Sequence, residues 1–370
     1  MNINIKITMQ NIPASIHDKR NVKLHNKECN PICLIKQRIY SYFESYKKFK
    51  IFDDLHEVVS IENNFDLLLI PKDHPSRSKS DTYYLNSNEV LRTHTSAHQN
   101  ELLVKGETCF LVTGDVYRKD EIDRFHYPVF HQMEGVYLVG SEVNPEEDLK
   151  NTLSKLVEFL FPNKQYRFNS DYFPFTNPSY EIEVLFGEKW VEILGCGVVQ
   201  PKILEHNNVT GQAWAFGLGL ERLAMILYSI PDIRLFWTND EKFLSQFVGK
   251  SCMDNITFTE YAKIPSITKD ISFWLPACDV EIVDENNKII WTKQNDFMDI
   301  VRNCMDTNIE KIELVDQFFH PKKQQYSQCW RMTLNPSTNI TDPAIFCSLC
   351  NEKMVELASS LGFQMGLTVR

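Results

Sequence analysis

The stretch that decides the fold runs from Gly114 to Gly135 and reads GDVYRKDEIDRFHYPVFHQMEG. An apolar strand ends at Arg118, a charged segment follows, and a second strand returns from Pro128 with Gln132 and Glu134. Alternate residues of a strand share a face, so we expect a hairpin that holds Arg118 opposite the Gln132 and Glu134 end. An arginine fork suits a phosphate or a carboxylate, and a carboxylate beside an amide suits an ammonium. The hairpin therefore predicts a site for an amino acid beside a nucleotide phosphate.

The alternative interpretation of this hairpin is an ordinary cross-strand ion pair on an exposed surface. A second stretch, Gly211–Leu227, favours the binding site. Its segment Trp214–Gly219 predicts a buried strand with small residues where a ligand approaches the backbone. The helix that begins near Glu221 has Arg222 in its first turn, where the macrodipole disfavours a cation, so an anionic ligand is the expected reason for this arginine.

Together these stretches resemble motifs 2 and 3 of the class II aminoacyl-tRNA synthetases, specifically of the single-chain mitochondrial phenylalanyl-tRNA synthetases. The resemblance runs in one unbroken order from about Asn21 to the end of the chain. Five further matching segments are DHPSR (Asp73–Arg77), LRTHTSAHQ (Leu91–Gln99), YFPFT (Tyr172–Thr176), VEILGCG (Val191–Gly197) and IPDIRLFW (Ile230–Trp237).

The resemblance implies a ligase that makes phenylalanyl-adenylate from phenylalanine and ATP, with Mg²⁺, and transfers phenylalanine to tRNA(Phe). It further implies a monomer that serves protein synthesis in the mitochondrial matrix. The implied fold is α+β, with a catalytic domain built on an antiparallel sheet with flanking helices and a C-terminal ferredoxin-like domain. The expected divisions are residues 1–45 as a basic extension with a possible transit peptide and a helix, 46–250 as the catalytic domain, 251–262 as a linker, and 263–370 as the anticodon-binding domain.

Local patterns support this division. After Ile267 the expected elements follow the order strand, helix, strand, strand, helix, strand, which is the ferredoxin-like order. Pro31 opens a helical pattern, and Asn151–Phe161 reads as an amphipathic helix. The apolar run Asp66–Ile70 predicts a buried strand. The segment Asn335–Pro343 departs from the family's pattern.

Composition limits the other possibilities. Of the 370 residues, 43% are hydrophobic and 24% charged, as in an ordinary globular protein. No stretch approaches 18 uninterrupted apolar residues, so we expect no membrane span. Ten scattered cysteines indicate free thiols in a reducing compartment. The net charge is −10, and only residues 1–50 are basic, with 10 Lys/Arg against 3 Asp/Glu, so we expect RNA to be held by local patches. The first twenty residues fit a transit peptide and a disordered extension about equally well.

For the nucleotide, the resemblance implies that Arg118 bridges the substrate carboxylate and the α-phosphate, while Phe130 and Arg222 stack on the two faces of adenine. Arg118 and Arg222 are the implied catalytic residues, and Glu192 is expected near the Mg²⁺. For Glu192, an exposed strand face is the alternative. The implied ATP-binding residues are Arg118, Asp120, His126, Phe130, Glu192 and Arg222.

For the amino acid, Phe173 and Phe175 read either as ordinary core or as an aromatic wall for an aromatic substrate. His94 and His98 stand four residues apart, but no third ligand accompanies them at suitable spacing, so we reject a zinc site. The implied phenylalanine-binding residues are His94, Ser96, Gln132, Glu134, Phe173, Phe175, Ala215 and Phe216.

Candidate phosphate contacts for tRNA are His320, Lys322, Lys323 and Arg331. Three other functions remain as alternatives. A catalytically dead paralogue is expected to lose Arg118 or Arg222, and both are present. A synthetase for another amino acid is expected to lack the Phe-Pro-Phe element, and a bacterial-type α-subunit is expected to lack the C-terminal domain.

Overall fold

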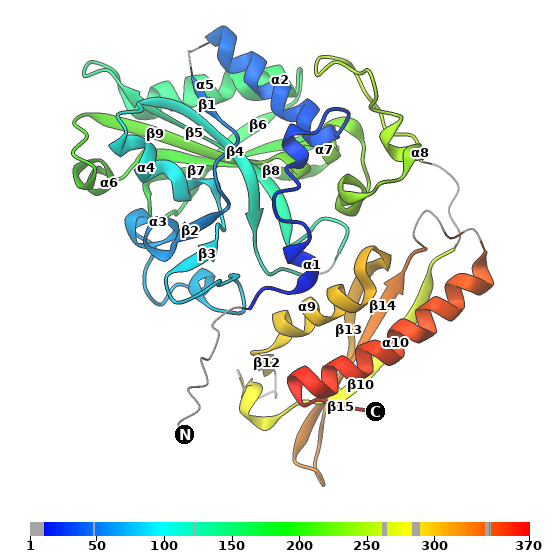
Figure 1. The fold of residues 1–370 in the computed structure, drawn as a ribbon. Coiled ribbons are helices and arrows are strands. Elements are labelled where there is room, and N and C mark those ends of the chain that lie inside the picture. The colour runs from blue at the N-terminus through cyan, green and yellow to red at the C-terminus, as the bar shows by residue number, and fades with distance from the viewer. Residues whose placement is uncertain are drawn as a thin grey trace, which may run out of the picture.

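The computed structural model describes residues 11–46, 49–121, 123–260, 265–282, 289–336, 340 and 342–370. It has two main sheets, each with its own hydrophobic core (Figure 1). We call residues 11–260 the N-terminal part and residues 265–370 the C-terminal part. Within the described ranges, no helix has both the length and the apolar character needed to cross a membrane. All ten cysteines lie in these ranges, and none of them forms a disulfide.

The N-terminal part is built on a seven-stranded sheet in the order β1-β4-β5-β9-β8-β7-β6. The predicted sheet is therefore present, although it is mixed, because β1 pairs parallel with β4 while every other neighbouring pair is antiparallel. The expected hairpin is formed by β4 and β5. The strands are β1 Lys50–Phe52, β4 Cys109–Tyr117, β5 Val129–Val139, β6 Tyr166–Asp171, β7 Thr176–Phe186, β8 Lys189–Val199 and β9 Gln212–Gly219.

Three long helices pack on one face of this sheet: α2 (Pro31–Tyr46), α5 (Pro145–Leu160) and α7 (Leu220–Tyr228) (Figure 1). Helix α2 starts with proline, whose fixed φ suits a first helical position. Its apolar residues Ile32, Ile35, Ile39 and Phe43 recur at helical spacing and are fully buried. This helix is therefore part of the N-terminal core rather than of a separate extension.

Short elements cover the opposite face. They are β2 Val58–Ser60, α3 Ile61–Asn64, η2 Asp66–Leu68, η3 Pro75–Arg77, β3 Glu89–Leu91, η4 Thr95–His98, α4 Gln99–Val104 and α6 Pro201–His206. The strand predicted at Asp66–Ile70 is wrong. A 3-10 turn forms there, and Leu69 has a φ of 59°. Arg77 holds this turn closed, because its Nη2 donates to Asp66 Oδ1 at 2.6 Å and to the carbonyl of Ile70.

Further short elements join these layers: α1 Ala14–His17, η1 Leu24–Asn26, η5 Ile233–Trp237 and α8 Glu241–Leu244. The expected linker begins later than its composition predicts. Ile256 and Phe258 are buried in the N-terminal core, and the Phe258 amide donates to the carbonyl of Tyr228 at 2.7 Å. The chain therefore leaves the N-terminal part only after Phe258.

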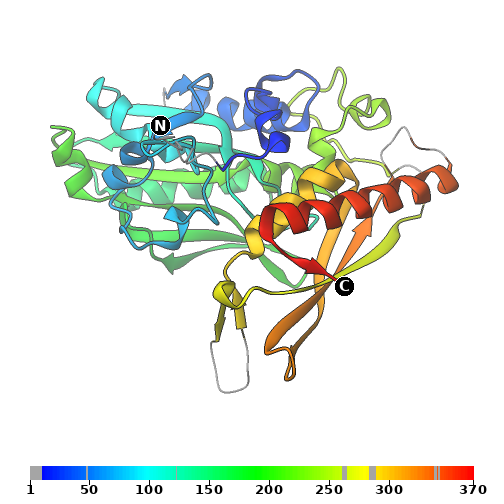
Figure 2. The ribbon, with the colours of Figure 1, turned by 60° about the horizontal axis from the view of Figure 1, so that its bottom comes forward.

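The C-terminal part has a four-stranded antiparallel sheet in the order β13-β14-β10-β15, with two helices on one face (Figure 2). Its elements follow the order predicted from the sequence, and a small hairpin, β11–β12, is added between the first strand and the first helix. The bounds are β10 Ile267–Trp274, η6 Ala277–Asp279, β11 Val280–Ile282, β12 Ile289–Trp291, α9 Gln294–Met305, η7 Asp306–Asn308, β13 Ile309–His320, β14 Gln325–Leu334, α10 Pro343–Met365 and β15 Thr368–Val369.

Two expectations fall partly outside the described residues. The possible transit peptide includes residues 1–10, and the divergent segment includes residues 337–339 and 341. In the described remainder of that segment, Asp342 caps helix α10 by accepting from the amide of Ala344 at 2.8 Å. Asp342 thus has a local structural role, as aspartate commonly has before a helix.

Candidate active site

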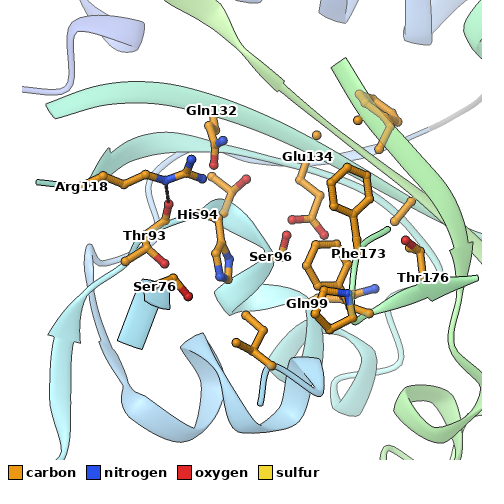
Figure 3. Close-up of a pocket in the computed structure, with 18 of the residues that line it drawn as sticks. Ser76, Thr93, His94, Ser96, Gln99, Arg118, Gln132, Glu134, Phe173 and Thr176 are labelled. Atoms are coloured by element: carbon orange, nitrogen blue, oxygen red, sulfur yellow. Dashed lines mark hydrogen bonds between the residues drawn. The ribbon is translucent and has the colours of Figure 1, made fainter. Parts of the chain in front are cut away.

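A cavity of about 580 Å³ lies on the sheet face that carries the short elements (Figure 3). Strands β5, β8 and β9 supply one wall, and the segments 93–99 and 172–176 supply the other. Cavities of this size commonly hold small-molecule ligands. Of the predicted phenylalanine- and ATP-binding residues, the cavity brings together His94, Ser96, Arg118, Asp120, Gln132, Glu134, Phe173, Phe175, Glu192, Ala215 and the backbone region of Phe216.

Glu134 is the most unusual group in this cavity. Only 3% of the residue is exposed, and its Oε2 has no hydrogen-bonding partner among the described residues. Burial raises the pKa of this carboxyl to about 8, although a hydrogen bond with Ser96 acts in the opposite direction. A buried carboxylate without a cation is costly. A ligand that brings an ammonium would therefore be stabilised beside Glu134.

The side chain of Arg118 is long enough to extend into the cavity. The amide of Arg118 donates to the carbonyl of Pro128, whereas Gln132 pairs with Gly114. The prediction that Arg118 lies opposite the Gln132 end of the hairpin is therefore wrong, because the strand pairing places Arg118 opposite Pro128. Its side chain nevertheless extends toward His94 and Gln132 (Figure 3). Nε of Arg118 donates to the carbonyl of Thr93 at 2.7 Å, which fixes the guanidinium at the cavity wall.

The two histidines considered for a metal pair take different positions. His94 is enclosed, and burial, followed by the charge of Arg118, lowers the pKa of His94 to about 3, so its ring is neutral at pH 7. The Nε2 of His98 instead lies 2.8 Å from Arg92 Nη1. Arg92 in turn donates to Asp115 through Nη2 at 2.9 Å. His98 therefore contacts β4 indirectly, through Arg92, whereas His94 faces the cavity.

Phe173 and Phe175 form the aromatic wall. Their rings lie parallel, with centroids 5.8 Å apart, so no third ring fits between them, and an aromatic ligand must pack against their edges or outer faces. A Cβ built on Gly195 would lie only 3.0 Å from Phe173 Cζ, so Phe173 depends on that glycine for its position. Gly217, in contrast, has nothing within 4 Å of such a Cβ, which leaves the cavity open over β9.

Phe216 does not contribute its ring to the cavity. Side chains alternate along β9, so Ala215 and Gly217 share the cavity face while Phe216 points to the opposite face. There its ring stacks on Phe43 of α2, with centroids 5.4 Å apart. Phe216 thus lines the cavity while its ring packs in the core under the helices, and its contact with phenylalanine stays a prediction.

At the other end of the cavity, Arg222 is paired with Glu192. Nη1 of Arg222 donates to Glu192 Oε2 at 2.9 Å and to its carbonyl at 3.2 Å, and both side chains are about half exposed. The guanidinium of Arg118 lies over the ring of Phe130, 5.3 Å from its centroid. Arg222 and Phe130 border the cavity rather than line it.

His126 is turned away from the cavity. Its Nδ1 lies 2.8 Å from Asp123 Oδ2, and the residue borders a separate small cavity together with Arg302. His126 is therefore not among the residues that line the large cavity, and its contact with the nucleotide stays a prediction.

Among the lining residues that the sequence analysis missed, Glu181 and Gln99 carry polar groups of particular interest. Glu181 on β7 lies near Glu192, and its pKa is raised by burial, followed by repulsion from Glu192 and Asp171. The signal that singled out Glu192, an acid in a largely apolar strand, was present for Glu181 as well. Gln99 also lines the cavity, and its buried Nε2 has no partner within the described ranges. No sequence pattern distinguishes it from other helix glutamines.

Glu181 and Glu192 are the groups that could hold a metal here. In the part of the chain that the structure describes, no cluster of three or more His, Cys, Asp or Glu side chains is arranged for a metal ion. Two carboxylates fit Mg²⁺, because this ion is commonly bound by one or two carboxylates while substrate phosphates and waters complete its shell.

The predicted tRNA contacts divide into two groups on the outer face of the C-terminal sheet. His320 and Lys323 gather around Trp274, with the His320 ring centroid at 5.5 Å and Lys323 Nζ at 4.5 Å from that of the indole. Arg370 also lies over this indole, at 4.9 Å, and Lys322 is exposed in the adjoining β13–β14 turn. Arg331 is separate, because it donates twice to Asp270, at 2.8 Å each.

We call Trp274, Phe318, His320, Lys323 and Arg370 the outer-face cluster. The Phe318 ring meets Trp274 edge-on at 5.9 Å, and Arg370 lies 5.2 Å from the Phe318 centroid. Trp274, Phe318 and Arg370 were missed from the sequence because they are far apart along the chain. The pairing of β10 with β14 and β15, and of β13 with β14, brings them together.

Comparison with known proteins identifies the family. Residues 15–247 match the family described as tRNA synthetases class II core domain (F). The phenylalanine–tRNA ligase, chloroplastic/mitochondrial, of Arabidopsis thaliana is 46% identical over 349 residues, which cover 90% of this chain and 78% of that protein. The mitochondrial phenylalanine–tRNA ligase of Mus musculus is 42% identical over 365 residues, with 87% and 78% covered.

An α subunit of phenylalanine–tRNA ligase, from Hamiltonella defensa, is 39% identical over 249 residues, covering 65% of this chain and 74% of that protein. Among solved structures, a pyrrolysyl tRNA synthetase from Desulfitobacterium hafniense has a TM-score of 0.44 at 13% identity, with 56% of this chain and 72% of that chain covered. The match over 90% of the chain must include most of the C-terminal part. The chain therefore belongs to the class II tRNA synthetases and, within them, to the single-chain phenylalanine–tRNA ligases of mitochondria and chloroplasts.

Proposed function

We propose that this chain attaches phenylalanine to tRNA(Phe) in the mitochondrial matrix, through a phenylalanyl-adenylate made from phenylalanine and ATP. The single observation that carries the proposal is the cavity, which places an aromatic wall beside a buried carboxylate and an arginine. These three features match the ring, the ammonium and the carboxylate of phenylalanine. The mitochondrial names of the relatives support the location.

In this proposal, Glu134 and Gln132 hold the ammonium of phenylalanine. The ionised form of Glu134, which burial disfavours in the free protein, is stabilised by the bound cation. Ser96 keeps the carboxylate oriented, and His94 stays neutral, so it adds no repulsion to the ammonium. The ring of the substrate packs against Phe173, Phe175 and Ala215, which supply apolar surface and no polar group.

Arg118 is proposed to bridge the substrate carboxylate and the α-phosphate of ATP. The carboxylate oxygen attacks the α-phosphorus and pyrophosphate leaves, so the protein needs no nucleophile. Catalysis comes from positioning and from charge neutralisation by an arginine that is already held in place by Thr93. Asp120 follows Arg118 by two residues and is proposed to contact the nucleotide.

Adenine is proposed to stack between Phe130 and Arg222. For this, Arg222 must exchange Glu192 for the nucleotide. The released Glu192, with Glu181, fits Mg²⁺, which would neutralise phosphate charge. His126 joins the nucleotide site only if the loop of residues 118–128 rearranges.

In the second step, the 2′-hydroxyl of the terminal adenosine of tRNA attacks the acyl carbon and AMP leaves. We propose that residues 46–250 hold the catalytic domain, to which the buried helix α2 also belongs, and that residues 251–262 lead to the C-terminal domain. Residues 263–370 form a ferredoxin-like anticodon-binding domain, as their element order supports. One chain carries both domains, and we propose that it acts as a monomer.

The outer-face cluster is the proposed surface for RNA bases. Aromatic rings flanked by cations suit single-stranded RNA, because bases stack on rings while cations meet phosphates. Lys322 and Arg331 are proposed phosphate contacts beside it. Arg331 must share its charge with Asp270 in this role.

The test is ATP–pyrophosphate exchange by the purified chain with each standard amino acid, followed by aminoacylation of tRNA(Phe). We expect exchange with phenylalanine and weaker exchange with tyrosine, because an apolar pocket rejects an added hydroxyl by only about a hundredfold. Exchange with another amino acid in preference to phenylalanine, or none at all, contradicts the proposal.

A further inference from the structure

Helix α9 of the C-terminal part lies directly against the loop that joins β4 to β5 (residues 118–128) (Figure 1). This loop begins with Arg118 and carries Asp120, both assigned above to the nucleotide. The C-terminal part thus contacts the proposed activation site, although the family comparison places the class II core in residues 15–247 alone.

The first contact is made to the main chain of the loop. Nη2 of Arg302 donates to the carbonyl of Glu121 at 2.8 Å and also to the carbonyl of Asp120. Nη1 of Arg302 donates to Asp299 Oδ1 at 3.0 Å, one turn earlier on α9. Because Arg302 is buried and paired, its guanidinium is held in the orientation that these two carbonyls require.

The second contact is a buried charge cluster. Lys119 Nζ donates to Asp296 Oδ1 at 2.9 Å and lies 3.4 Å from Asp299 Oδ2. The side chains of Lys119 and Asp299 are only 4% and 6% exposed. Tyr83 of the N-terminal part donates its hydroxyl to Asp299 Oδ1 at 3.0 Å. Removing one partner of this cluster while the rest stays buried would therefore leave a desolvated charge without its counter-charge, which is strongly unfavourable.

As a result, the side chains of the adjacent loop residues Arg118 and Lys119 point in opposite directions. The Arg118 side chain turns into the cavity and the Lys119 side chain turns out to α9. A third contact reinforces this arrangement, because Asn295 Nδ2 donates at 3.1 Å to Asp81, a residue that lines the cavity. Helix α9 thus holds two segments of the cavity wall from outside.

We infer that α9 is a positioning element for amino-acid activation, in which Asp296, Asp299 and Arg302 hold the loop so that Arg118 and Asp120 meet ATP. The inference rests on the proposed function. The two equilibria are linked. If docking of α9 against the loop increases the affinity for ATP by some factor, bound ATP must favour the docked state by the same factor. The C-terminal part therefore contributes to activation, beyond its role in holding RNA.

The first experiment measures pyrophosphate exchange by the full chain without tRNA, with ATP varied at saturating phenylalanine. In Arg302→Ala we expect the KM for ATP to rise about tenfold, the loss associated with hydrogen bonds from a charged donor. The KM for phenylalanine should change little, and Arg302→Lys, which keeps the charge and one donor, should recover part of the loss.

The matched control is Lys353→Ala. Lys353 is a cation of the C-terminal part that also donates to a carbonyl, that of Cys304 at 2.8 Å, but it makes this contact within the C-terminal part. If Lys353→Ala raises the KM for ATP as much as Arg302→Ala does, the effect comes from general destabilisation and the inference is wrong.

A second variant guards against misfolding of Arg302→Ala. Asp296 is about one-third exposed, so Asp296→Asn should fold, and we expect it to raise the KM for ATP about threefold by weakening the Lys119 pair. In the wild type, an ATP analogue should slow amide hydrogen exchange in residues 294–305. If the wild type exchanges pyrophosphate normally but neither effect occurs, the inference fails. If the wild type does not activate phenylalanine, the proposed function itself fails.

Discussion

The cavity and the outer-face cluster both present charges to a ligand, but in opposite environments. In the cavity, Glu134 is buried and His94 is half-buried, and each has enclosed polar atoms without partners among the described residues. On the outer face, Lys323 and Arg370 rest on the Trp274 ring, and Arg331 is paired with Asp270 beside solvent. Buried charges interact strongly and are weakly screened, whereas exposed ones are weak and sensitive to salt. The effects of substitutions on the kinetics should therefore differ between the two regions, both in size and in their dependence on salt.

The largest effect is expected for Arg118→Lys. Lysine keeps the charge but loses the planar fork that bridges two acceptors, so kcat/KM for adenylate formation should fall about a hundredfold or more. The measurement is ATP–pyrophosphate exchange. Arg167→Lys is the matched control, since Arg167 also pairs with a carboxylate, Glu183 at 2.6 Å, but on an exposed strand. Normal exchange by Arg118→Lys would remove this residue from the site.

Next in size is the pH dependence that Glu134 imposes. Its folded-state pKa of about 8 lies above the ordinary value of 4.5, so the carboxylate that binds an ammonium forms only as the pH rises toward 8. Phenylalanine affinity should increase by about tenfold per pH unit below that value and then level off. Calorimetric titration between pH 6.5 and 8.5 checks this.

The same shift has a consequence for stability. Because the unfolded chain releases this proton at lower pH than the folded chain does, Glu134 lowers stability progressively as pH rises from about 4.5 to about 8. Glu134→Gln should bind phenylalanine weakly at every pH and should lose less stability than the wild type over this range. A wild-type affinity that does not vary with pH would contradict the assignment of Glu134 to the ammonium.

A smaller effect is expected on the outer face. Trp274→Ala should raise the KM for tRNA(Phe) about tenfold, the value of one stacked base, and leave amino-acid activation unchanged. Trp274→Phe should restore most of the loss. The effect of Lys323→Ala, in contrast, should fade as salt is added. If Trp274→Ala impairs pyrophosphate exchange as well, the two regions are not separable in the way described.

The smallest effect is expected for Ala215→Gly. Removing one methyl group from the cavity wall should raise kcat/KM for p-chlorophenylalanine relative to phenylalanine about fourfold, in line with the burial of one carbon group. Ala213→Gly is the matched control, because it makes the same change on the same strand at a fully buried position outside the cavity. An equal ratio in both variants would mean that Ala215 matters only for packing.

The sequence predicted what depends on local pattern. The β4–β5 hairpin, the buried strand β9, helix α2 and all six main elements of the C-terminal part follow from apolar periodicity and from proline positions. The strand expected at Asp66–Ile70 failed because Arg77 closes a turn there, a contact that no periodicity encodes.

The site was predicted less completely, for a related reason. Resemblance brought Glu134, Ser96 and Arg118 together, but it did not show that Phe216 faces the core, a matter of strand alternation that the pattern around Gly217 left open. The contacts of α9 were missed altogether. They join residues about 180 to 220 positions apart, such as Lys119 with Asp296 and Tyr83 with Asp299, and only the tertiary packing places them together.

The shape of the pocket also depends on the absence of a Cβ atom at Gly195. Gly195 lets the ring of Phe173 come within 3.0 Å of the place where a Cβ would stand, so any larger residue at 195 would make that ring shift. A mutation that adds a single carbon there would narrow the range of accepted amino acids while every polar contact to the substrate stayed in place. Amino-acid selectivity can therefore change through steric crowding at residue 195 alone. A search restricted to polar recognition residues would not find this position.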